Sequence, residues 1–491
     1  MNLSHLQKHR HIVDGTIWVF LAEALLMPTG VIITVFLTRR LGPEGYGLFT
    51  LVAVLVAWVE SSITSIFDRT TVKFVGQAED WRPVGAVLAR LYLAASGGAM
   101  LLLWLLAHPI ATLLNEPVLA TYLRLFALDI PLFSLAHAHR NILVGLGAFR
   151  QRALVSAGRW LTRLLLIVLL VELGFSVPGA ILGSIGASLV ELVIGRLHVR
   201  PPLFCRSNLP VRQLWGYAAP LFLFALSLHF YSKLDLFALK VLGGTAVQAG
   251  IYSAAQNLTR LPNIFVKSFS PLLLATLSRM LRAGESHPAR EMGRNAMRAV
   301  IGLLPLAGMI AGAASEIIGL IFGLPYLSAA PLLALLIFGA LALVMISVAT
   351  AILTAAGKPG WSFALAGPLL PLAIAGHLLL IPRLGAMGAS LVTTLVAVLG
   401  ALAAVLAVYH TWRILPPTAT LWRSTLLCGL AYALAILWPT PGLLVLVKLP
   451  VIGLIVGLLF LLLGEFSAGE IALARSMLRW QTVCGRNIRE V

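Results

Sequence analysis

Charged residues are rare in this chain, and their rarity argues against a soluble protein. They make up 11% of its 491 residues, whereas soluble domains carry about 25%. Hydrophobic residues make up 59% of the chain, and the mean hydropathy is +0.96. A helix needs about 20 apolar residues to cross the bilayer core, and lipid offers no partner to an unpaired backbone group. We therefore predict an all-α polytopic membrane protein.

Cysteines and catalytic motifs are also few. The three cysteines, Cys205, Cys428 and Cys484, lie far apart without the spacing of metal ligands, so we interpret them as structural. The sequence contains no Walker motif, no GxSxG motif and no paired catalytic carboxylates. We expect neither an enzyme nor a cofactor or metal site. Energy for any transport would come from an ion gradient, the membrane potential or consumption of the product.

Acidic residues are outnumbered two to one, with 36 basic and 18 acidic side chains and a net charge of +18. In a soluble protein such a balance would indicate nucleic acid. Here the basic residues are spread over many short loops, which is typical of the charge bias that orients membrane helices. We therefore expect no nucleic-acid partner.

Fourteen apolar segments are predicted to cross the membrane. The polar stretch MNLSHLQKHRH precedes the first of them, and we expect no cleavable signal there. The first six are predicted at 13–38, 46–66, 84–107, 118–143, 152–173 and 177–196. The other eight are predicted at 213–241, 249–279, 296–320, 328–355, 361–381, 385–410, 421–438 and 443–463.

The distribution of Lys and Arg predicts the orientation. With the N-terminus in the cytoplasm, most basic residues fall on the inner side, and we assign Arg140, Arg159 and Arg163 to that group. The outer loops then hold only Arg39, Arg40, Lys240 and Arg383. This asymmetry predicts that both termini are cytoplasmic. The short outer loops leave no room for an external catalytic domain.

An internal duplication is indicated by three short matches in the same order. Because each copy would contain six spans, both copies would enter the membrane in the same direction, related by an axis along the membrane normal. The matched pairs are Leu41-Gly42 with Leu242-Gly243, 141–150 with 351–360, and 183–190 with 385–392. We predict two six-helix bundles plus two extra C-terminal helices. The expected domains are an N-lobe at 1–200, a C-lobe at 201–412, helices 13–14 at 413–465, and an amphipathic or partly ordered cytoplasmic tail at 466–491.

Several segments carry a family resemblance. They are RRLGPEGYGLF (39–49), DRTTVKFVG (68–76), GAILGSIGASLVELVIG (179–195), AGIYSAAQNLTRLPNIFVKSFSPLLLATLSRM (249–280) and IPRLGAMGASLVTTLVAV (381–398). On these, the chain resembles, over nearly its whole length, the polysaccharide (O-antigen type) flippases of the multidrug/oligosaccharidyl-lipid/polysaccharide flippase superfamily. The resemblance implies two lobes around a central cavity.

The resemblance also implies a substrate and a location. The substrate would be an oligosaccharide on a polyprenyl diphosphate, flipped from the cytoplasmic to the outer leaflet of a bacterial inner membrane. The pathway would export O-antigen lipopolysaccharide, capsule or exopolysaccharide. The implied partners are this lipid-linked oligosaccharide and membrane lipids, with polysaccharide polymerase and chain-length proteins as further candidates.

A polar stripe on the predicted helix 249–279 is the first candidate for substrate binding. Gln256, Arg260, Asn263 and Lys267 follow one another at spacings of 4, 3 and 4, which places them on one helix face. Ionisable residues within membrane spans are costly and by default mark a substrate or ion path. Arg can hold a phosphate in a bidentate way, whereas Lys acts as a point charge. The alternative is an interhelical charge pair that stabilises the bundle.

Two further cations and two acids are candidates. Lys233 could face the same cavity or pair with an acid, and Arg124 could receive the diphosphate at the outer side or extend to the lipid headgroups. Glu23 and Glu60 lie within predicted spans, where a carboxyl could be protonated in turn and couple an ion to transport. A structural ion pair is the alternative for each acid.

The segment TRRLGPEGYG predicts a tight turn on the outer face between the first two spans. Gly42 and Gly45 permit the turn, and Pro43 sets its entry. Arg39 and Arg40 run against the inside-positive trend. We interpret the segment either as an outer gate turn or as a contact with outer headgroups.

Four functions remain open from the sequence. A lipid-linked oligosaccharide flippase is favoured. A cation-coupled exporter of small molecules from the same superfamily is the first alternative, although such exporters usually handle cations and the stripe here is cationic. A membrane polysaccharide polymerase or ligase would need catalytic groups on a large outer loop. A non-transporting scaffold would not need Arg260 and Lys267 within the membrane.

Overall fold

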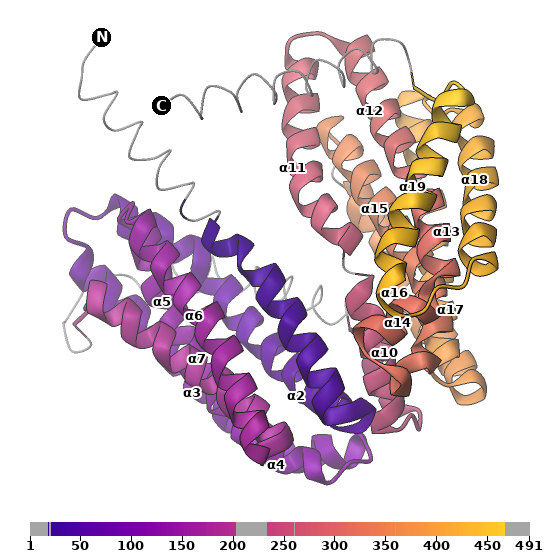
Figure 1. Ribbon diagram of the computed structural model, residues 1–491. Coiled ribbons are helices and arrows are strands. Elements are labelled where there is room, and N and C mark those ends of the chain that lie inside the picture. Colours follow the sequence, from indigo (N-terminus) through magenta and orange to yellow (C-terminus); the bar gives the residue numbers. More distant parts are fainter. Residues whose placement is uncertain (1–17, 19–20, 203–232, 260, 359, 467–491) are drawn as a thin grey trace, which may run out of the picture. The chain divides into compact units, whose positions relative to one another are not determined.

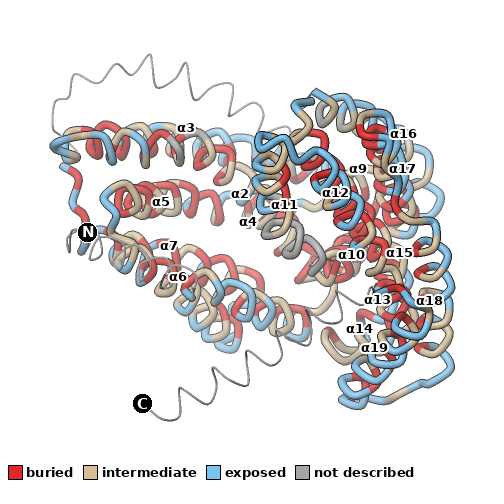
Figure 2. The backbone as a smooth tube through the Cα atoms, turned by 90° about the horizontal axis from the view of Figure 1, so that it is seen from above, coloured by how far each residue is buried: buried red, intermediate tan, exposed pale blue. Residues whose placement is uncertain are grey.

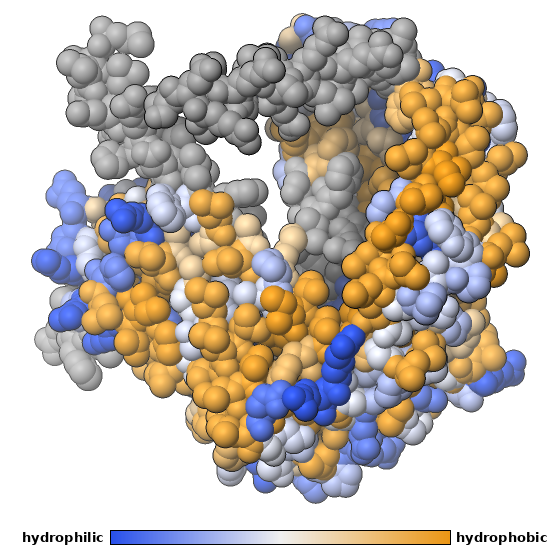
Figure 3. Space-filling view, viewed as in Figure 1, coloured by the Kyte–Doolittle hydropathy of each residue, from blue (hydrophilic) through white to orange (hydrophobic). Residues whose placement is uncertain are grey.

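The computed structural model describes residues 18, 21–202, 233–259, 261–358 and 360–466, apart from the side chains of 66, 69, 261–268, 362, 363 and 366. This part of the chain is helical and contains no strand. It holds 10 candidate membrane spans, and two of these, Leu21–Gln77 and Phe149–His198, each cover two of the predicted spans. Figure 3 shows apolar side chains over the outward faces of α6, α7, α18 and α19. The prediction of an all-α polytopic membrane protein is confirmed.

The chain forms two compact units. Unit 1 comprises Met1–Ala254 and His377–Ala389, and unit 2 comprises Ala255–Gly376 and Ser390–Val491. In Figure 2 the buried backbone of each unit lies where its own helices face one another. Unit 1 extends past residue 200, so its limits differ from those of the predicted N-lobe. The division into two six-helix lobes stays a prediction.

Unit 1 is built around the long helix α2, which packs against α3, α5, α6 and α7. Its helices are α2 (Leu26–Gln77), α3 (Trp81–Leu113), α4 (Val118–Ala127), α5 (Asp129–Gly145), α6 (Phe149–Leu170), the π-turn η1 (Val171–Phe175), α7 (Ser176–His198), α9 (Leu234–Val241) and the first part of α10 (Ala246–Leu258). Helix α2 bends at Gly42, where φ is 66° and ψ is −178°. The predicted turn is therefore present at Gly42, between the two predicted spans.

Left-handed glycines support two of the three repeat matches. Gly42 and Gly243 have φ of 66° and 100°, and Gly147 and Gly357 have φ of 70° and 77°. The third match is wrong as a structural equivalence, because Gly183 lies inside α7 whereas Gly385 has a φ of 57° just before α17 (Ala386–Trp412). The turn glycine before α7 is Gly174, with φ 93°. A left-handed residue costs little only for glycine, so turn positions repeat more faithfully than helix interiors.

Unit 2 contains most of the remaining helices. They are α11 (Leu261–Arg282), α12 (Ser286–Ile301), α13 (Leu304–Gly312), α14 (Ala314–Ile321), the 3₁₀ turn η2 (Leu324–Ala329), α15 (Ala330–Ala355), the 3₁₀ turn η3 (Gly442–Leu444) and most of α16 (Gly360–Leu384) and α17. The predicted helix 249–279 is divided here into α10 and α11, with a turn at Thr259. Buried apolar side chains of α11, α12, α13, α15 and α17 form a core of this unit.

The two extra helices, α18 (Thr418–Leu437) and α19 (Val445–Leu462), pack on α13 and are held by ion pairs at both ends. At one end, the fully buried Lys448 Nζ lies 2.5 Å from Glu316 Oε2 and donates to the Ala435 carbonyl. At the other end, Glu465 accepts hydrogen bonds from Arg298, Arg423 and Thr420. Lys448 thus joins α19 to α14, and Glu465 joins the end of α19 to α12 and α18, all within unit 2.

The Glu465 site predicts a pH dependence of stability. Burial alone would raise the pKa of this carboxyl, but hydrogen bonds from Thr420, Arg298 and Arg423 outweigh burial and lower the pKa below its ordinary value. A lowered folded-state pKa contributes stability above the ordinary carboxyl pKa, and the contribution is lost as the pH falls through the folded value. Glu465→Gln should therefore lose about 1.5–3 kcal/mol at pH 7, the range for hydrogen bonds to a charged group.

Thermal unfolding of detergent-solubilised protein across pH checks this expectation. The difference between wild type and Glu465→Gln should stay constant at neutral pH and shrink below the ordinary pKa of a carboxyl group. The exposed Glu285, at the start of α12, offers a matched control, and Glu285→Gln should differ little from wild type at any pH. Equal melting temperatures for Glu465→Gln and wild type at pH 7 would contradict the prediction.

Candidate functional site

The interior of unit 1 holds a set of ionisable side chains that we call the unit 1 charge cluster. They come from α2 and the residues before it, from α5, from α6 and from α7. Its members are Glu23, Glu60, Asp68, Asp129, His137, Arg140, Arg152, Arg159, Arg163 and Glu191. Membrane spans rarely carry so many ionisable groups, and such residues mark functional paths by default.

Glu191 on α7 is the centre of the cluster. Its side chain is 0% exposed, its Oε2 lies 2.9 Å from Arg159 Nη1, and its Oε1 lies 3.2 Å from Arg140 Nη1. The Arg159 guanidinium also stacks over the Phe133 ring, 4.2 Å from its centroid. A buried carboxylate persists only when it is paired and hydrogen-bonded. The two arginines, from α6 and α5, provide that pairing.

A second group surrounds Asp68 on α2. Asn141 Nδ2 donates to Asp68 Oδ1 at 2.7 Å, and Tyr92 Oη donates to the same oxygen at 3.4 Å. His137 Nε2 also lies 2.8 Å from this oxygen. Arg140 contacts Nδ1 of His137, so this one arginine links the Asp68 group with Glu191.

The deepest part of the cluster contains polar atoms without hydrogen-bond partners in the described part of the chain. Glu60 and Asp129 are buried and lie within electrostatic reach of Arg159 and Arg163. Arg159 Nε and Arg163 Nε are among the buried atoms without such a partner, whereas Asp129 lies within hydrogen-bonding reach of Glu60 and Ser188. Unsatisfied buried polar atoms are costly and indicate a place for water, an ion or a ligand.

One edge of the cluster is accessible. The side chains of Asp68, Glu23 and Arg152 are 41%, 39% and 26% exposed, and Arg152 Nη2 lies 3.4 Å from Glu23 Oε1. Arg152 is also within electrostatic reach of Arg140 and Asp68. The cluster therefore runs from an exposed edge to the fully buried Glu191. Its arginines can hold an anion at the edge, and its carboxyls can take up or release protons.

The predicted candidates are distributed unevenly over the described residues. Glu23 and Glu60 belong to the unit 1 charge cluster. Lys233, before α9, and Gln256, on α10, are half-buried and each makes contacts with other residues. Arg260 lies outside the described residues, and Asn263 and Lys267 lie on α11 with side chains outside them. The substrate-binding role of the stripe stays a prediction.

Arg124 and the outer turn are placed at the surface. The exposed Arg124 guanidinium lies 5.0 Å from the centroid of the exposed Trp104 ring, which is typical of a residue that extends to the headgroups. Arg40 Nη2 pairs with Glu172 Oε1 of η1 at 2.6 Å, and both are exposed. Arg39 is exposed and also makes contacts, and Gly45 packs beside Leu41 on α2.

The sequence-based orientation counts Arg140, Arg159 and Arg163 with the basic residues of the inner side, and that orientation stays a prediction. The structure places the three arginines within α5 and α6, where Arg140 and Arg159 pair with the buried Glu191. The charge-bias rule does not distinguish one arginine near the end of a span from another. In the structure, an arginine points into the helix bundle where a neighbouring helix carries a buried acid. Arg152, Arg159 and Arg163 recur at spacings of 7 and 4, a one-face pattern that could have revealed them.

Solved structures with this fold are membrane transporters. A lipid II flippase MurJ in an inward closed conformation matches with a TM-score of 0.70 and 15% identity, over 91% of this chain and 98% of that one. An inward-facing multidrug resistance MATE family transporter of the MOP superfamily matches with a TM-score of 0.60 and 14% identity, over 78% and 95%. A mutant form of the Vibrio cholerae MATE transporter VcmN matches with a TM-score of 0.56 and 16% identity, over 82% and 97%. At these identities the likeness shows the fold.

The sequence comparisons identify the family. No curated protein sequence matches the chain. The model of one family, described as polysaccharide biosynthesis protein, matches residues 12–280, which is more than half of the chain and includes the whole described charge cluster. The chain is therefore a multi-pass membrane protein that belongs to the polysaccharide biosynthesis protein family.

Proposed function

We propose that this protein is a flippase that moves a polyprenyl-diphosphate-linked oligosaccharide from the cytoplasmic to the outer leaflet of a bacterial inner membrane by alternating access. The unit 1 charge cluster carries the proposal, because four arginines that reach from an accessible edge into a membrane-spanning unit suit an anionic head. Membership of the polysaccharide biosynthesis protein family and the fold shared with the lipid II flippase support it.

The accessible edge defines the proposed binding contacts. Arg152 and Arg140 would each donate to diphosphate oxygens, since a guanidinium binds phosphate through paired N–H groups. Both now face carboxylates or His137, so an incoming diphosphate competes with protein acids for them. The Arg260 and Lys267 cations are proposed to add contacts from the second half of the chain.

Ion coupling follows from the same competition. When a diphosphate takes the positive charge of Arg152, the carboxylate of Glu23 loses its partner, and Glu23 is the first proposed coupling carboxyl. Glu60, next to Asp129 and the two deeper arginines, is the second proposed coupling carboxyl. Flipping breaks no covalent bond, so we propose a transporter without enzymatic activity. Its termini are proposed to be cytoplasmic, and polymerase and chain-length proteins are proposed partners.

A cation-coupled exporter of small molecules is the second candidate. The shared fold with MATE family transporters favours it. A cationic cargo would find the exposed carboxylates of Glu23 and Asp68, which lie near Arg152 at the accessible edge. A membrane polymerase or ligase is less well supported, since it would need catalytic groups on a large outer loop and the sequence predicts only short outer loops.

A leaflet-resolved analysis of lipid-linked oligosaccharides tests the proposal. Deletion of the gene should cause a single-unit, diphosphate-linked intermediate to accumulate where only cytoplasmic reagents reach it, and the intact gene should reverse this. Mass spectrometry of the intermediate would identify the sugar. Absence of the intermediate together with increased sensitivity to cationic compounds would favour the exporter. Long precursors already on the outer leaflet would indicate a ligase.

A further inference from the structure

Two glycines allow an unusually close helix approach within unit 1, at the end where α2 bends. A Cβ added to Gly47 on α2 would lie 2.8 Å from the backbone nitrogen of Gly250 on α10, and nearer still to the Ala246 carbonyl oxygen. A Cβ added to Gly250 would lie 3.0 Å from the backbone nitrogen of Gly47, and nearer still to the Pro43 carbonyl oxygen. Real Cβ atoms essentially never come as close to a backbone oxygen as these two would, so both positions require glycine. We call this contact the glycine crossing.

The glycine crossing is self-complementary. Each glycine meets the carbonyl oxygen of the residue four positions before the other glycine, Pro43 in one case and Ala246 in the other. Both segments follow a left-handed glycine, Gly42 or Gly243. Exchanging the two segments therefore reproduces the contact, as in an isologous interface between two copies of one subunit. The two segments, one from each predicted repeat, contact each other within unit 1 through equivalent backbone surfaces.

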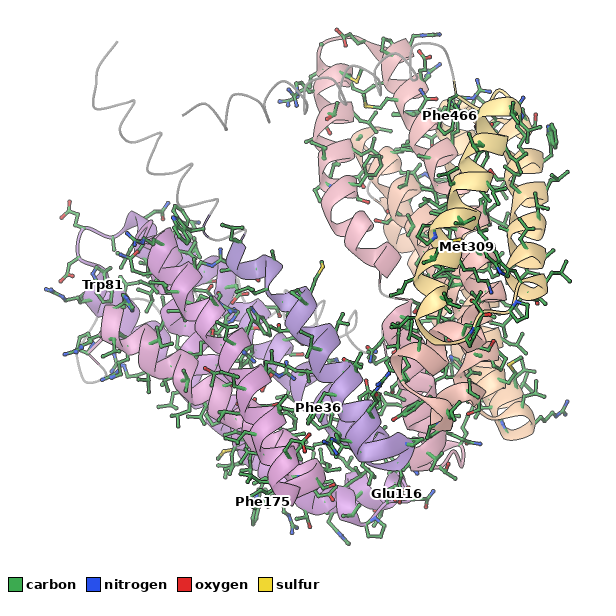
Figure 4. The ribbon with its side chains drawn as sticks, in the orientation of Figure 1. Phe36, Trp81, Glu116, Phe175, Met309 and Phe466 are labelled. Atoms are coloured by element: carbon green, nitrogen blue, oxygen red, sulfur yellow. The ribbon has the colours of Figure 1, made fainter. Side chains whose placement is uncertain are left out.

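An ion pair between a buried lysine and a partly exposed glutamate lies at the same end of unit 1. Lys240, at the end of α9, is 2% exposed, and its Nζ lies 2.8 Å from Glu116 Oε1 and 2.9 Å from the Gly244 carbonyl oxygen. Figure 4 labels Glu116 in the turn between α3 and α4. The stacked rings of Trp58 and Phe237, with centroids 6.3 Å apart, add a contact between α2 and α9. The sequence had assigned Lys240 to an exposed outer loop, and the structure buries it.

We propose that the glycine crossing and the Lys240–Glu116 pair together form the latch of the outer gate, which separates to release the substrate. This inference rests on the proposed function, because only alternating access requires the end to open. A glycine crossing has no interlocked side chains, so its two helices can part and rejoin without repacking. Separation also returns both ions of the pair to water, and their hydration offsets the lost attraction. Because the closed and the open arrangement then differ little in free energy, these contacts suit an element that switches between the two.

The latch includes residues outside the predicted gate turn. Arg39, Arg40, Gly42 and Gly45 lie on α2 alone. The latch adds Gly250 and Lys240 from the second repeat and Glu116 from the α3–α4 turn. Gly42 supplies the bend, and Gly47, one helical turn past Pro43, supplies the contact surface.

Distance measurement between spin labels tests the latch without substrate, so its outcome is separate from that of the flippase proposal. Labels at the exposed positions Glu44→Cys on α2 and Val247→Cys on α10 report this end, in a full-length protein whose three native cysteines are replaced by serine. The parent protein should show a short-distance population. Gly250→Ala and, separately, Lys240→Met should each shift at least half of that population to longer distances.

The control is Gly30→Ala, also on α2, where an added Cβ would meet nothing within 4 Å and the distances should stay as in the parent. Lys240→Met adds no atom to the crossing, so it tests the latch even where an alanine variant fails to fold. A distribution identical to that of Gly30→Ala in either folded variant would overturn the proposal. A parent protein with no short-distance population would overturn it as well.

Discussion

Arg152→Ala is expected to reduce translocation of the lipid-linked oligosaccharide by about 10- to 100-fold, with the protein still folded and present in the membrane. Arg152 lies at the accessible edge of the charge cluster, with 26% of its side chain exposed beside Glu23. A hydrogen bond to a charged group contributes about 1.5–3 kcal/mol, and 1.4 kcal/mol corresponds to a factor of ten. Arg152→Lys should be intermediate, because it keeps the charge and loses the paired donors.

The measurement for Arg152 is the rate at which the substrate becomes accessible on the opposite leaflet of reconstituted vesicles. Arg290→Ala, an arginine exposed on α12 in unit 2, is the matched control and should stay within about twofold of wild type, as expected for a surface substitution. Equal rates for Arg152→Ala and wild type, at equal amounts of folded protein, would remove the accessible edge from the proposed binding site.

Glu191→Gln is expected to cause the largest loss of stability, about 3–5 kcal/mol, because it leaves Arg140 and Arg159 as buried charges without their shared carboxylate. The side chain of Glu191 is 0% exposed, so water cannot replace the lost partner. Glutamine has nearly the same volume as glutamate, so the lost stability would come from the missing charge and not from a cavity.

Glu172→Gln is the matched control for Glu191→Gln. Glu172 also pairs with an arginine, Arg40, at 2.6 Å, but the two side chains are 42% and 58% exposed. Exposed ion pairs contribute about 0–1 kcal/mol. Thermal unfolding of the purified proteins should therefore rank the two variants clearly. Similar melting temperatures would mean that Glu191 is solvated in the membrane protein and that the cluster interior is wet.

The sequence predicted the fold class, most span positions and the bend at Gly42, because these depend on local properties. The length of an apolar segment, a helix-breaking residue and a left-handed glycine each affect only the backbone a few residues to either side. The predicted ends of segments were wrong where contacts with neighbouring helices extend a helix. Helix α2 continues to Gln77, so Asp68 lies inside it and bonds Asn141 of α5 and Tyr92 of α3.

The candidate site was predicted only in part, through Glu23 and Glu60. Both stood out because an acid within an apolar run is visible in the sequence. The arginines that pair with buried acids were not visible in this way, since Arg140 and Arg159 lie near span ends where basic residues are expected. Their partner Glu191 is 32 residues from Arg159 and 51 from Arg140 along the chain. Whether charged residues so far apart in the sequence are buried together depends on which helix faces pack against each other.

The sequence by itself therefore determined that this protein crosses the membrane many times and that charges persist inside its spans. Each of these follows from the free energy of placing side chains and backbone in lipid, which acts on every segment separately. Only the tertiary structure decided which charges meet. It joined Glu191 to two arginines, buried Lys240 against Glu116, and brought Gly47 against Gly250. Pairing energies act between helices that lie side by side, such as α6 and α7 in Figure 1, and the sequence pattern of one helix does not show which helix will lie beside it.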